Sequence, residues 1–500
     1  MKGTLDLPGV VPMVMLLAAA AARGFAFVPA VIDTDEGLYL LQARAWRESG
    51  WPFLSVWDMH PPGAPALFVL AFALFGESLA AVRLLGILAT AATATLLFAI
   101  ARTLRAGRAA SLAAGVLYAG QSSLLTGLAT NTEILFAPFV AAALLVAAGA
   151  GEGAKESPIG FAPLAAMGLS IGAALVIKQV VVFEGCFAFA VAVLPALRFG
   201  RLTVLGLAAR ATLYAVCCAL PTGLLFAAYG AIGATDLLWD ALVLAPFRYH
   251  GQAIGVEARL WAILGAGVTV LPALALAFGG TLLRHRDDGA LLLFGWSWLA
   301  VALGAIAAPG MYFQHYFLIA LPPLSLIAGL GAVRVALAFR PPAPAGLVAL
   351  LVGAIAISAW RDEAIDRLAS GRGVWRADPV REVAHALAGV LPPRATVLMA
   401  NYHVTVLFLA GMTPASRFVF PAHLTGHYGT VMPVDADEEL ARVLAARPAA
   451  IVIDRGWLHV LRPPALAAIE AALAEAYVLA AKIAEDRGPV EVWRLARPAQ

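Results

Sequence analysis

The chain has 500 residues, of which 62% are hydrophobic and only 13% charged, whereas ordinary soluble domains carry about 45–50% apolar and about 25% charged residues. This composition excludes a typical soluble globular protein and predicts a protein that is embedded in the lipid bilayer. The net charge of +3 is too small to indicate nucleic acid, and no basic stripe or aromatic-and-basic motif accompanies it. The three cysteines, Cys186, Cys217 and Cys218, lie in apolar runs and lack the spacing of a metal site or a disulfide framework.

About eleven apolar segments are long enough to cross a bilayer, because a spanning helix needs roughly 20 residues. We expect the first to be a retained helix and not a cleaved signal peptide. The shorter run 63–75 predicts a re-entrant or interfacial helix. The expected spans are 10–31, 79–103, 109–128, 133–149, 159–177, 180–197, 211–229, 260–282, 289–308, 317–335 and 343–360.

Basic residues predict the orientation of these spans, because loops on the cytoplasmic side are enriched in Lys and Arg. The even-numbered connections hold Arg102, Arg105, Arg108, Lys155, Arg198, Arg201, Arg284, Arg286, Arg334 and Arg340. The opposite connections hold fewer, chiefly Arg44, Arg47, Lys178, Arg248 and Arg259. We therefore expect a cytoplasmic N-terminus and an exported C-terminal region.

The character of the chain changes after Trp360, where charged residues become common and no span-length apolar run occurs. Short apolar runs predict buried strands, and amphipathic runs predict helices. The strands are 396–399 and 450–454, and the helices are 437–446 and 464–474. We expect a transmembrane domain over 1–360, with its first outer loop at 32–62, and a small extracytoplasmic α/β domain over 361–500.

Three carboxylates stand together at the start of the first outer loop. Asp33, Asp35 and Glu36 follow directly after the first apolar run, where an ionised side chain is costly unless it has a function. Asp33 and Glu36 have the spacing of a capping box, so helix capping explains Asp33. Asp35 is not needed for such a cap and is predicted to take part in chemistry. The residues from Leu38 to Glu48 predict a helix that lies along the membrane surface.

Two further candidates lie near predicted membrane boundaries. In the segment from Trp57 to Gly63, Pro61 and Pro62 force an extended backbone that exposes His60. His60 can equally be an interfacial histidine without a function. The sequence Asn131-Thr132-Glu133 either caps the helix that follows it or contributes to a site.

Two more candidates come later in the chain. Lys178, followed by Gln179, can hold a phosphate or simply extend to the interface. Aromatic anchoring explains the tyrosines of Tyr312-Phe313-Gln314-His315-Tyr316, but it does not explain Gln314 and His315. The segment Arg248-Tyr249-His250 is a weaker candidate of the same kind.

These residue types fit glycosyl transfer from a lipid phosphate. No Walker, dinucleotide or HExxH motif occurs, so a nucleotide-dependent site is unsupported. A departing phosphate needs nearby positive charge, which Lys178, His60 or His315 can provide. The acceptor hydroxyl needs a base, which Asp35 can supply. No cofactor is certain. The carboxylates Asp35, Glu36 and Glu133 can bind Mg²⁺ or Mn²⁺, but their spacing does not demand a metal.

The same residues resemble the bacterial members of glycosyltransferase family 39, which includes protein O-mannosyltransferases and the aminoarabinose transferase of lipid A. The likeness covers roughly residues 10–335. It is carried by Asp35-Glu36 with Tyr39, Asp58-x-His60-Pro61-Pro62-Gly63, Asn131-Thr132-Glu133, Gly168 to Lys178, and His315-Tyr316 ahead of Pro322. The chain departs from the family pattern at His60, where close relatives often have Lys, and at Glu133, where they usually have Asp.

The resemblance implies a GT-C fold, a polyprenyl-phosphate sugar donor and inversion at the anomeric carbon. It implies that Asp35 is the acidic catalytic residue, with Glu36 as its partner. Lys178 corresponds to the lysine that follows the fifth span in the family. The acceptor is left open as a glycan, a lipid or a protein, and the location it implies is the bacterial inner membrane with an active site on the periplasmic side.

Two other functions compete with glycosyl transfer. A transporter or flippase of a lipid-linked or polar substrate would show inverted repeats and charges buried in mid-span. Here the charged candidates lie at outer span ends and in one asymmetric loop, which favours the transferase. A non-catalytic anchor for the outer domain would leave Asp35, His60 and Lys178 without a role. For the transferase, we expect these three side chains to converge on one outward cavity.

Overall fold

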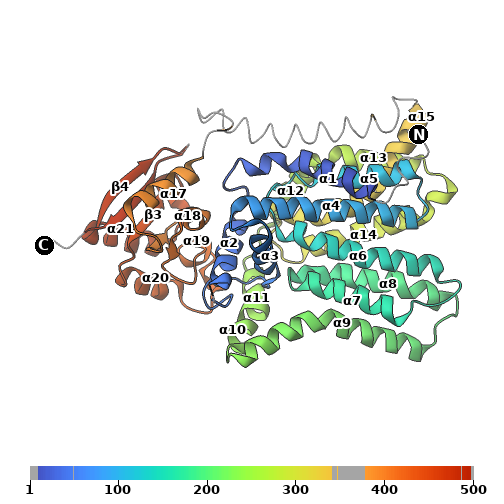
Figure 1. Ribbon diagram of the computed structural model, residues 1–500, viewed down its shortest axis with the longest axis horizontal. Coiled ribbons are helices and arrows are strands. Elements are labelled where there is room, and N and C mark those ends of the chain that lie inside the picture. Colours follow the sequence, from blue (N-terminus) through green and yellow to red (C-terminus); the bar gives the residue numbers. More distant parts are fainter. Residues whose placement is uncertain are drawn as a thin grey trace. The chain divides into compact units, whose positions relative to one another are not determined.

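The computed structural model describes residues 9–48, 50–339, 346, 375, 378–485 and 487–496. Contacts divide the chain into two units. Figure 1 labels the helices and strands. A helical unit comprises Met1–Phe25, Arg83–Gly233 and Ile254–Arg361. A mixed unit of helices and strands comprises Ala26–Val82, Ala234–Ala253 and Asp362–Gln500. The stretch 32–62 thus belongs to the same unit as the C-terminal region, whereas a boundary at residue 360 stays a prediction.

The helical unit consists of long apolar helices joined by short connections. Its helices are α1 (Val10–Arg23), most of α4 (Leu79–Thr103), α5 (Arg108–Gln121), α6 (Thr132–Gly153), α7 (Phe161–Leu175), α8 (Val182–Arg198), α9 (Val204–Ala231), α12 (Val256–Thr269), α13 (Leu271–Leu282), α14 (Gly289–Ala307) and α15 (Leu321–Phe339). Short 3₁₀ segments extend α8, α14 and α15 at their starts, and they are η3 (Gln179–Val181), η5 (Arg286–Asp288) and η6 (Gln314–Ala320).

Within the described ranges, seven helical segments are long and apolar enough to cross a membrane, or eight if α12 and α13 form one bent span. The expected span 260–282 is in fact this pair, bent by 72°. The expected spans 109–128 and 159–177 contain the shorter helices α5 and α7. The expected span 343–360 lies outside the described residues. The polytopic helical architecture is therefore confirmed.

Close packing of α7 explains two of its glycines. A side chain at Gly168 would meet the Cβ of Cys217 at 2.7 Å, and one at Gly172 would meet the carbonyl oxygen of Cys218 at 2.7 Å. Small residues four apart allow such backbone contact between apolar helices. The Gly-x-x-x-Gly pair thus packs α7 against α9, and α7 ends shortly before Lys178.

The first two helices of the mixed unit are α2 (Thr34–Arg47), within the stretch 32–62, and α3 (Gly63–Phe75), which follows that stretch. Every residue of α2 from Glu36 to Ala43 is buried, where α2 packs against α3 and α18 (Thr405–Ala410). A side chain at Gly37 would lie 2.4 Å from the hydroxyl of Thr405. The expected surface helix is therefore an interior helix over this stretch, because its apolar positions face protein on more than one side. α3 has the expected short length.

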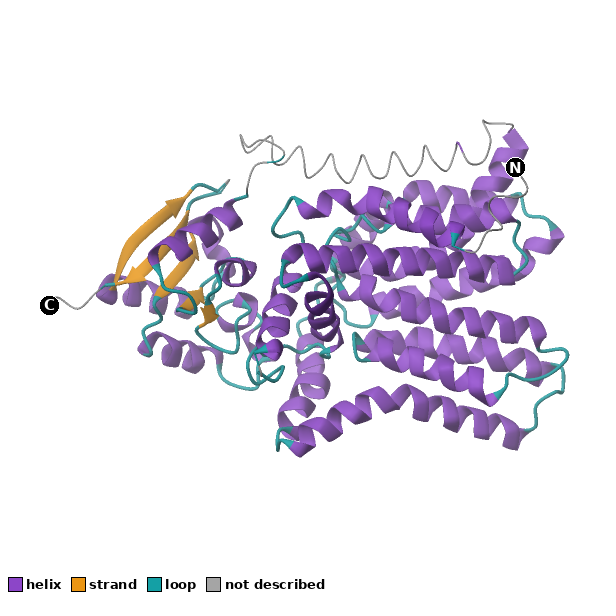
Figure 2. Ribbon diagram, viewed as in Figure 1, coloured by secondary structure: helices purple, strands orange, loops and turns teal. Residues whose placement is uncertain are grey.

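The C-terminal region forms a five-stranded sheet in the order β2-β1-β3-β5-β4, drawn in orange in Figure 2. β1 pairs in parallel with β2 and β3, whereas β5 pairs antiparallel with β3 and β4. The predicted strands are present as β1 and β3, and the two predicted helices as α20 (Ala436–Ala445) and α21 (Pro463–Ala476). β4 and β5 complete the sheet beyond these predictions. The strands are β1 (Thr396–Met399), β2 (Thr413–Pro414), β3 (Ala450–Asp454), β4 (Tyr477–Ile483) and β5 (Val490–Leu495).

Short helices make up the rest of the C-terminal region and the segment 234–253 of the mixed unit. In the C-terminal region they are α17 (Pro379–Val390), α18, α19 (Pro421–Leu424), η7 (Gly429–Val431), α20 (Ala436–Ala445), η8 (Arg455–Val460) and α21 (Pro463–Ala476). In residues 234–253 they are α10 (Thr235–Trp239), η4 (Asp240–Leu244) and α11 (Ala245–His250). Arg248 forms an ion pair with Asp240 at 2.8 Å and donates to the carbonyl of Val431 at 2.8 Å. This weaker candidate therefore connects the segment 234–253 to the C-terminal region within the mixed unit.

Candidate functional site

The carboxylates at the start of α2 have different surroundings. The Asp33 side chain accepts a hydrogen bond from the backbone N–H of Asp35 at 3.1 Å and caps the helix. Glu36 is buried, with 2% of its surface exposed, whereas Asp35 is half-buried. Capping therefore accounts for Asp33, as expected. Of the two acids in the first turn, Asp35 is the more accessible, and both benefit from the positive end of the helix dipole.

The second group of polar residues lies in the loop between α2 and α3. The Asp58 carboxylate contacts Nδ1 of His60 at 3.1 Å and accepts from the backbone N–H of Met59 at 2.7 Å. Burial alone would raise the pKa of the Asp58 carboxyl, but His60 and this N–H together hold the pKa below its usual value. Asp58 is thus an anion that orients His60 through its ring nitrogen.

His60 also contacts α2. The ring of Tyr39 meets the His60 ring edge-on, with the centroids 6.3 Å apart, and it contacts the Phe68 ring of α3 in the same way at 6.2 Å. Tyr39 itself is 2% exposed, while 15% of the His60 side chain is exposed. The structure thus brings Tyr39, Asp58 and His60 together, with the histidine as the most accessible of the three.

The C-terminal region packs against the loop that holds Asp58 and His60, through residues that were not predicted from the sequence. Trp57 packs on the rings of Phe418 and His423, at centroid distances of 5.4 and 5.5 Å, and its backbone N–H donates to the carbonyl of Arg417 at 2.8 Å. Burial lowers the pKa of His423 to about 4, although nearby Asp58 opposes this shift. His423 is therefore neutral near pH 7. No short-range pattern could have revealed it, because it lies far along the chain from Trp57.

The helical unit holds a separate cluster around a buried ion pair. Nζ of Lys178 lies 2.5 Å from a carboxylate oxygen of Glu133, and the other oxygen accepts from the hydroxyl of Thr132 at 3.0 Å. The side chains of Lys178 and Glu133 are 6% and 0% exposed. Burying two charges at this depth is favourable only if they pair well, so each fixes the other in place.

Aromatic rings surround the same lysine. Nζ of Lys178 lies 4.2 Å from the ring centroid of Tyr316, a distance at which a cation is attracted to the ring face. His315 is buried and packs edge-on against the Tyr316 ring at 4.9 Å. Gln179 is half-buried at the start of η3, and Gln314 is exposed at the start of η6. The structure therefore gathers Glu133, Lys178, His315 and Tyr316.

Asn131 begins α6 but does not cap it. The residue occupies the N-cap position, yet its side chain makes no capping hydrogen bond. Asn131 is 2% exposed, and among the described parts of the chain neither its amide nitrogen nor its amide oxygen has a hydrogen-bond partner. Buried polar groups are rarely left unpaired, so capping does not explain this residue.

No group of three or more His, Cys, Asp or Glu side chains is placed to hold a metal ion within the described ranges. The possibility of Mg²⁺ or Mn²⁺ at the carboxylates therefore rests on the sequence alone.

Part of the chain matches a known protein family. Residues 59–222 match the family described as dolichyl-phosphate-mannose-protein mannosyltransferase. The matched stretch includes His60, Glu133 and Lys178. This match over part of the chain agrees with the expected glycosyltransferase and with the resemblance to glycosyltransferase family 39. No curated protein sequence matches the chain.

The fold is similar over nearly the whole chain to that of ArnT from Cupriavidus metallidurans. The structure of ArnT bound to undecaprenyl phosphate is 15% identical, covers 97% of this chain and 98% of its own, and has a TM-score of 0.64. The apo state of ArnT is 14% identical, covers 96% and 97%, and has a TM-score of 0.62. The expected GT-C fold, with its helical membrane part and small C-terminal sheet, is therefore confirmed.

Proposed function

We propose that this chain transfers a sugar from a polyprenyl-phosphate donor to an acceptor hydroxyl, with inversion at the anomeric carbon. The single observation that carries the proposal is the fold shared with ArnT, a protein whose structure holds undecaprenyl phosphate. The proposed location is the bacterial inner membrane. The N-terminus is cytoplasmic, and residues 361–500 and the catalytic loop 32–62 face the periplasm, as the distribution of basic residues favours.

Asp35 is the general base in this proposal. Its half-buried position at the start of α2 leaves it accessible to an incoming hydroxyl, whereas Glu36 is buried and serves as its partner in the first turn. Asp33 is already engaged in capping the helix. A carboxylate within hydrogen-bond reach of the hydroxyl contributes typically 10²–10⁴-fold to the rate.

Lys178 stabilises the departing phosphate, and His60 and His315 support the same charge. An ammonium has three N–H donors. One of these is directed at Glu133, and the ring face of Tyr316 holds the charge from another side, so donor capacity is left for a phosphate oxygen. The buried pair fixes the position of Lys178 before the donor binds, which avoids reorganisation during the reaction.

The chemical step balances without a cofactor. The acceptor oxygen attacks the anomeric carbon and forms the new glycosidic bond. The bond between that carbon and the phosphate oxygen breaks, and its electron pair leaves with the polyprenyl phosphate, which departs as a monoester without a general acid. The acceptor proton passes to the carboxylate of Asp35.

The decisive experiment compares two neighbouring acids of similar size. We expect Asp35→Asn to abolish sugar transfer and leave membrane insertion intact. Asp33→Asn is the matched control, because asparagine caps a helix as well as aspartate does, and it should retain transfer. The assay uses purified protein, radiolabelled polyprenyl-phosphate sugar and membrane acceptors. Undiminished turnover in Asp35→Asn would refute the assignment of the base.

A transporter or flippase remains the alternative function. The family match over residues 59–222 favours the transferase, because that family is named for sugar transfer. Donor-dependent labelling of an acceptor by the purified protein distinguishes the two functions, since a transporter would move the donor without consuming it.

A further inference from the structure

A hollow of about 580 Å³ lies in the mixed unit, at the carboxyl ends of β1 and β3. The neighbours of β1 in the sheet are β2 on one side and β3 on the other, and both pair with it in parallel. The chain therefore leaves β1 toward one side of the sheet and later returns to the opposite side. In open α/β sheets, ligands bind outside the carboxyl ends of the strands at such a switch point. The position of the hollow thus indicates a binding site.

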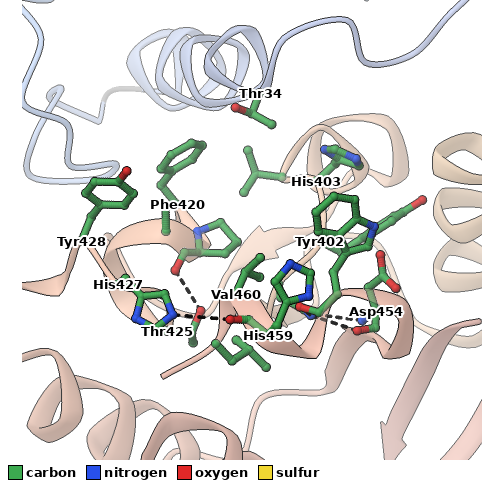
Figure 3. A pocket seen from close by; sticks show the side chains of 17 residues that line it. Thr34, Tyr402, His403, Phe420, Thr425, His427, Tyr428, Asp454, His459 and Val460 are labelled. Carbon is green, nitrogen blue, oxygen red and sulfur yellow. Dashed lines mark hydrogen bonds between the residues drawn. The ribbon is translucent and has the colours of Figure 1, made fainter. Parts of the chain in front are cut away.

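Aromatic rings form much of the wall of the hollow (Figure 3). Trp457 is 39% exposed, so part of its indole is open to a ligand in the hollow. The guanidinium of Arg487 lies 4.3 Å from the centroid of its ring, so the indole is held from one side. The other rings that line the hollow belong to Tyr402, Phe420, Tyr428, His403, His427 and His459.

A fixed carboxylate provides the polar end. Asp454 ends β3 and is 5% exposed, and its side chain accepts from the backbone N–H of Gly456 at 2.8 Å. The Asn401 side chain accepts from the N–H of Asp454 at 2.8 Å and donates to the carbonyls of Asp454 and Trp457 at 2.9 and 3.0 Å. Asn401 is therefore a positioning residue that sets Asp454 and Trp457 relative to each other. A carboxylate has about four lone-pair sites, which leaves capacity for donors on a ligand.

The charge of the lining argues against a phosphate ligand. Among the residues that the structure describes, neither Lys nor Arg lines the hollow, although phosphate recognition relies on these side chains. A ligand with an apolar face and several hydroxyl groups matches the lining better, because its C–H face packs on an aromatic ring while its hydroxyls donate to a carboxylate. A sugar ring has this chemistry.

We propose that this hollow binds a neutral sugar ring of a glycan, with the ring on Trp457 and its hydroxyls on Asp454. The hollow also reaches Thr34, the first residue of α2 and the neighbour of Asp35. If the proposed function holds, on which this last step rests, the sugar belongs to the acceptor, so the acceptor is a glycan or carries one.

The test measures binding without turnover. Probes are methyl α-mannopyranoside, methyl β-glucopyranoside and methyl β-N-acetylglucosaminide at millimolar concentration, added to the full chain in a detergent without a sugar headgroup. Saturation-transfer NMR reports which ligand protons contact the protein. We expect at least one glycoside to bind through its C–H face, and we expect Trp457→Ala and Asp454→Asn each to weaken binding about tenfold. Trp239→Ala, which removes a tryptophan that is 51% exposed and outside the hollow, should leave binding unchanged.

Each outcome decides for or against the site. Binding that is lost in both pocket variants and kept in Trp239→Ala supports it. If no glycoside binds, or if the pocket variants bind as well as the parent chain, the proposal is overturned. Displacement of the glycoside by inorganic phosphate would overturn the assignment of a neutral ligand. Because no donor is present, failure here is distinct from loss of transfer in Asp35→Asn. A raised KM for the acceptor in Trp457→Ala would assign the bound sugar to the acceptor.

Discussion

The buried pair of Lys178 and Glu133 can be tested as both a structural and a functional element. Lys178→Met leaves the Glu133 carboxylate at 0% exposure without the ammonium that neutralises it, although the hydroxyl of Thr132 still donates to it. Removing one member of a buried ion pair costs about 3–5 kcal/mol, and loss of the contact with Tyr316 adds about 0.5–2 kcal/mol. The Glu133→Gln variant should be destabilised for the same reason, because the ammonium of Lys178 then lacks its counter-charge.

The double variant Lys178→Met/Glu133→Gln separates the two roles. Removing both charges leaves no uncompensated charge in the interior, so we expect the double variant to recover part of the stability lost in either single variant. It should nevertheless fail to transfer sugar, because no ammonium remains to stabilise the departing phosphate. Lys155→Met, at an exposed lysine, is the control and should change stability by no more than about 0.5 kcal/mol.

The measurement is unfolding in mixed micelles with a rising fraction of SDS, followed by the transfer assay on the same preparations. A Lys178→Met protein as stable as the parent would refute the buried-pair energetics. Recovery of transfer in the double variant would show that the pair is purely structural and would refute the role of Lys178 in stabilising the phosphate.

Three further predictions follow from the mixed unit. Burial lowers the pKa of His403 and of His423 to about 4, so between pH 6.5 and 4 the unfolded chain binds up to two more protons than the folded one. The free energy of unfolding should therefore fall as pH falls, with a slope approaching about 2.7 kcal/mol per pH unit, and a melting temperature that does not change with pH would contradict this. Asp33→Ala should cost about 1 kcal/mol through loss of the cap, with Asp33→Asn as control in the same melting assay. Transfer by the parent chain should weaken as pH rises and His60 loses its proton, whereas the His60→Lys variant should stay active at higher pH. Identical pH profiles of transfer for the parent chain and His60→Lys would exclude a charged role for His60 beside Asp58.

Local patterns in the sequence determined the elements of this protein. The long apolar runs predict most of the spanning helices because a bilayer admits only segments whose backbone groups are satisfied internally. Asp33 predicts its own cap because its carboxylate reaches an N–H only two residues away. The strands β1 and β3 are short apolar runs between polar residues, and they form where the pattern places them.

The structure alone decided which of these residues meet. Lys178 and Glu133 are 45 residues apart, and each has a separate local explanation, as an interfacial lysine and as part of a helix start. Trp57 and His423 are still more distant in sequence, and no spacing relates them. The expected surface helix α2 is interior from Glu36 to Ala43, because elements much later in the chain cover its second side. Apolar period and capping act over a few residues and can be read from the sequence, whereas charge pairing and burial depend on how distant segments pack, which only the tertiary fold determines.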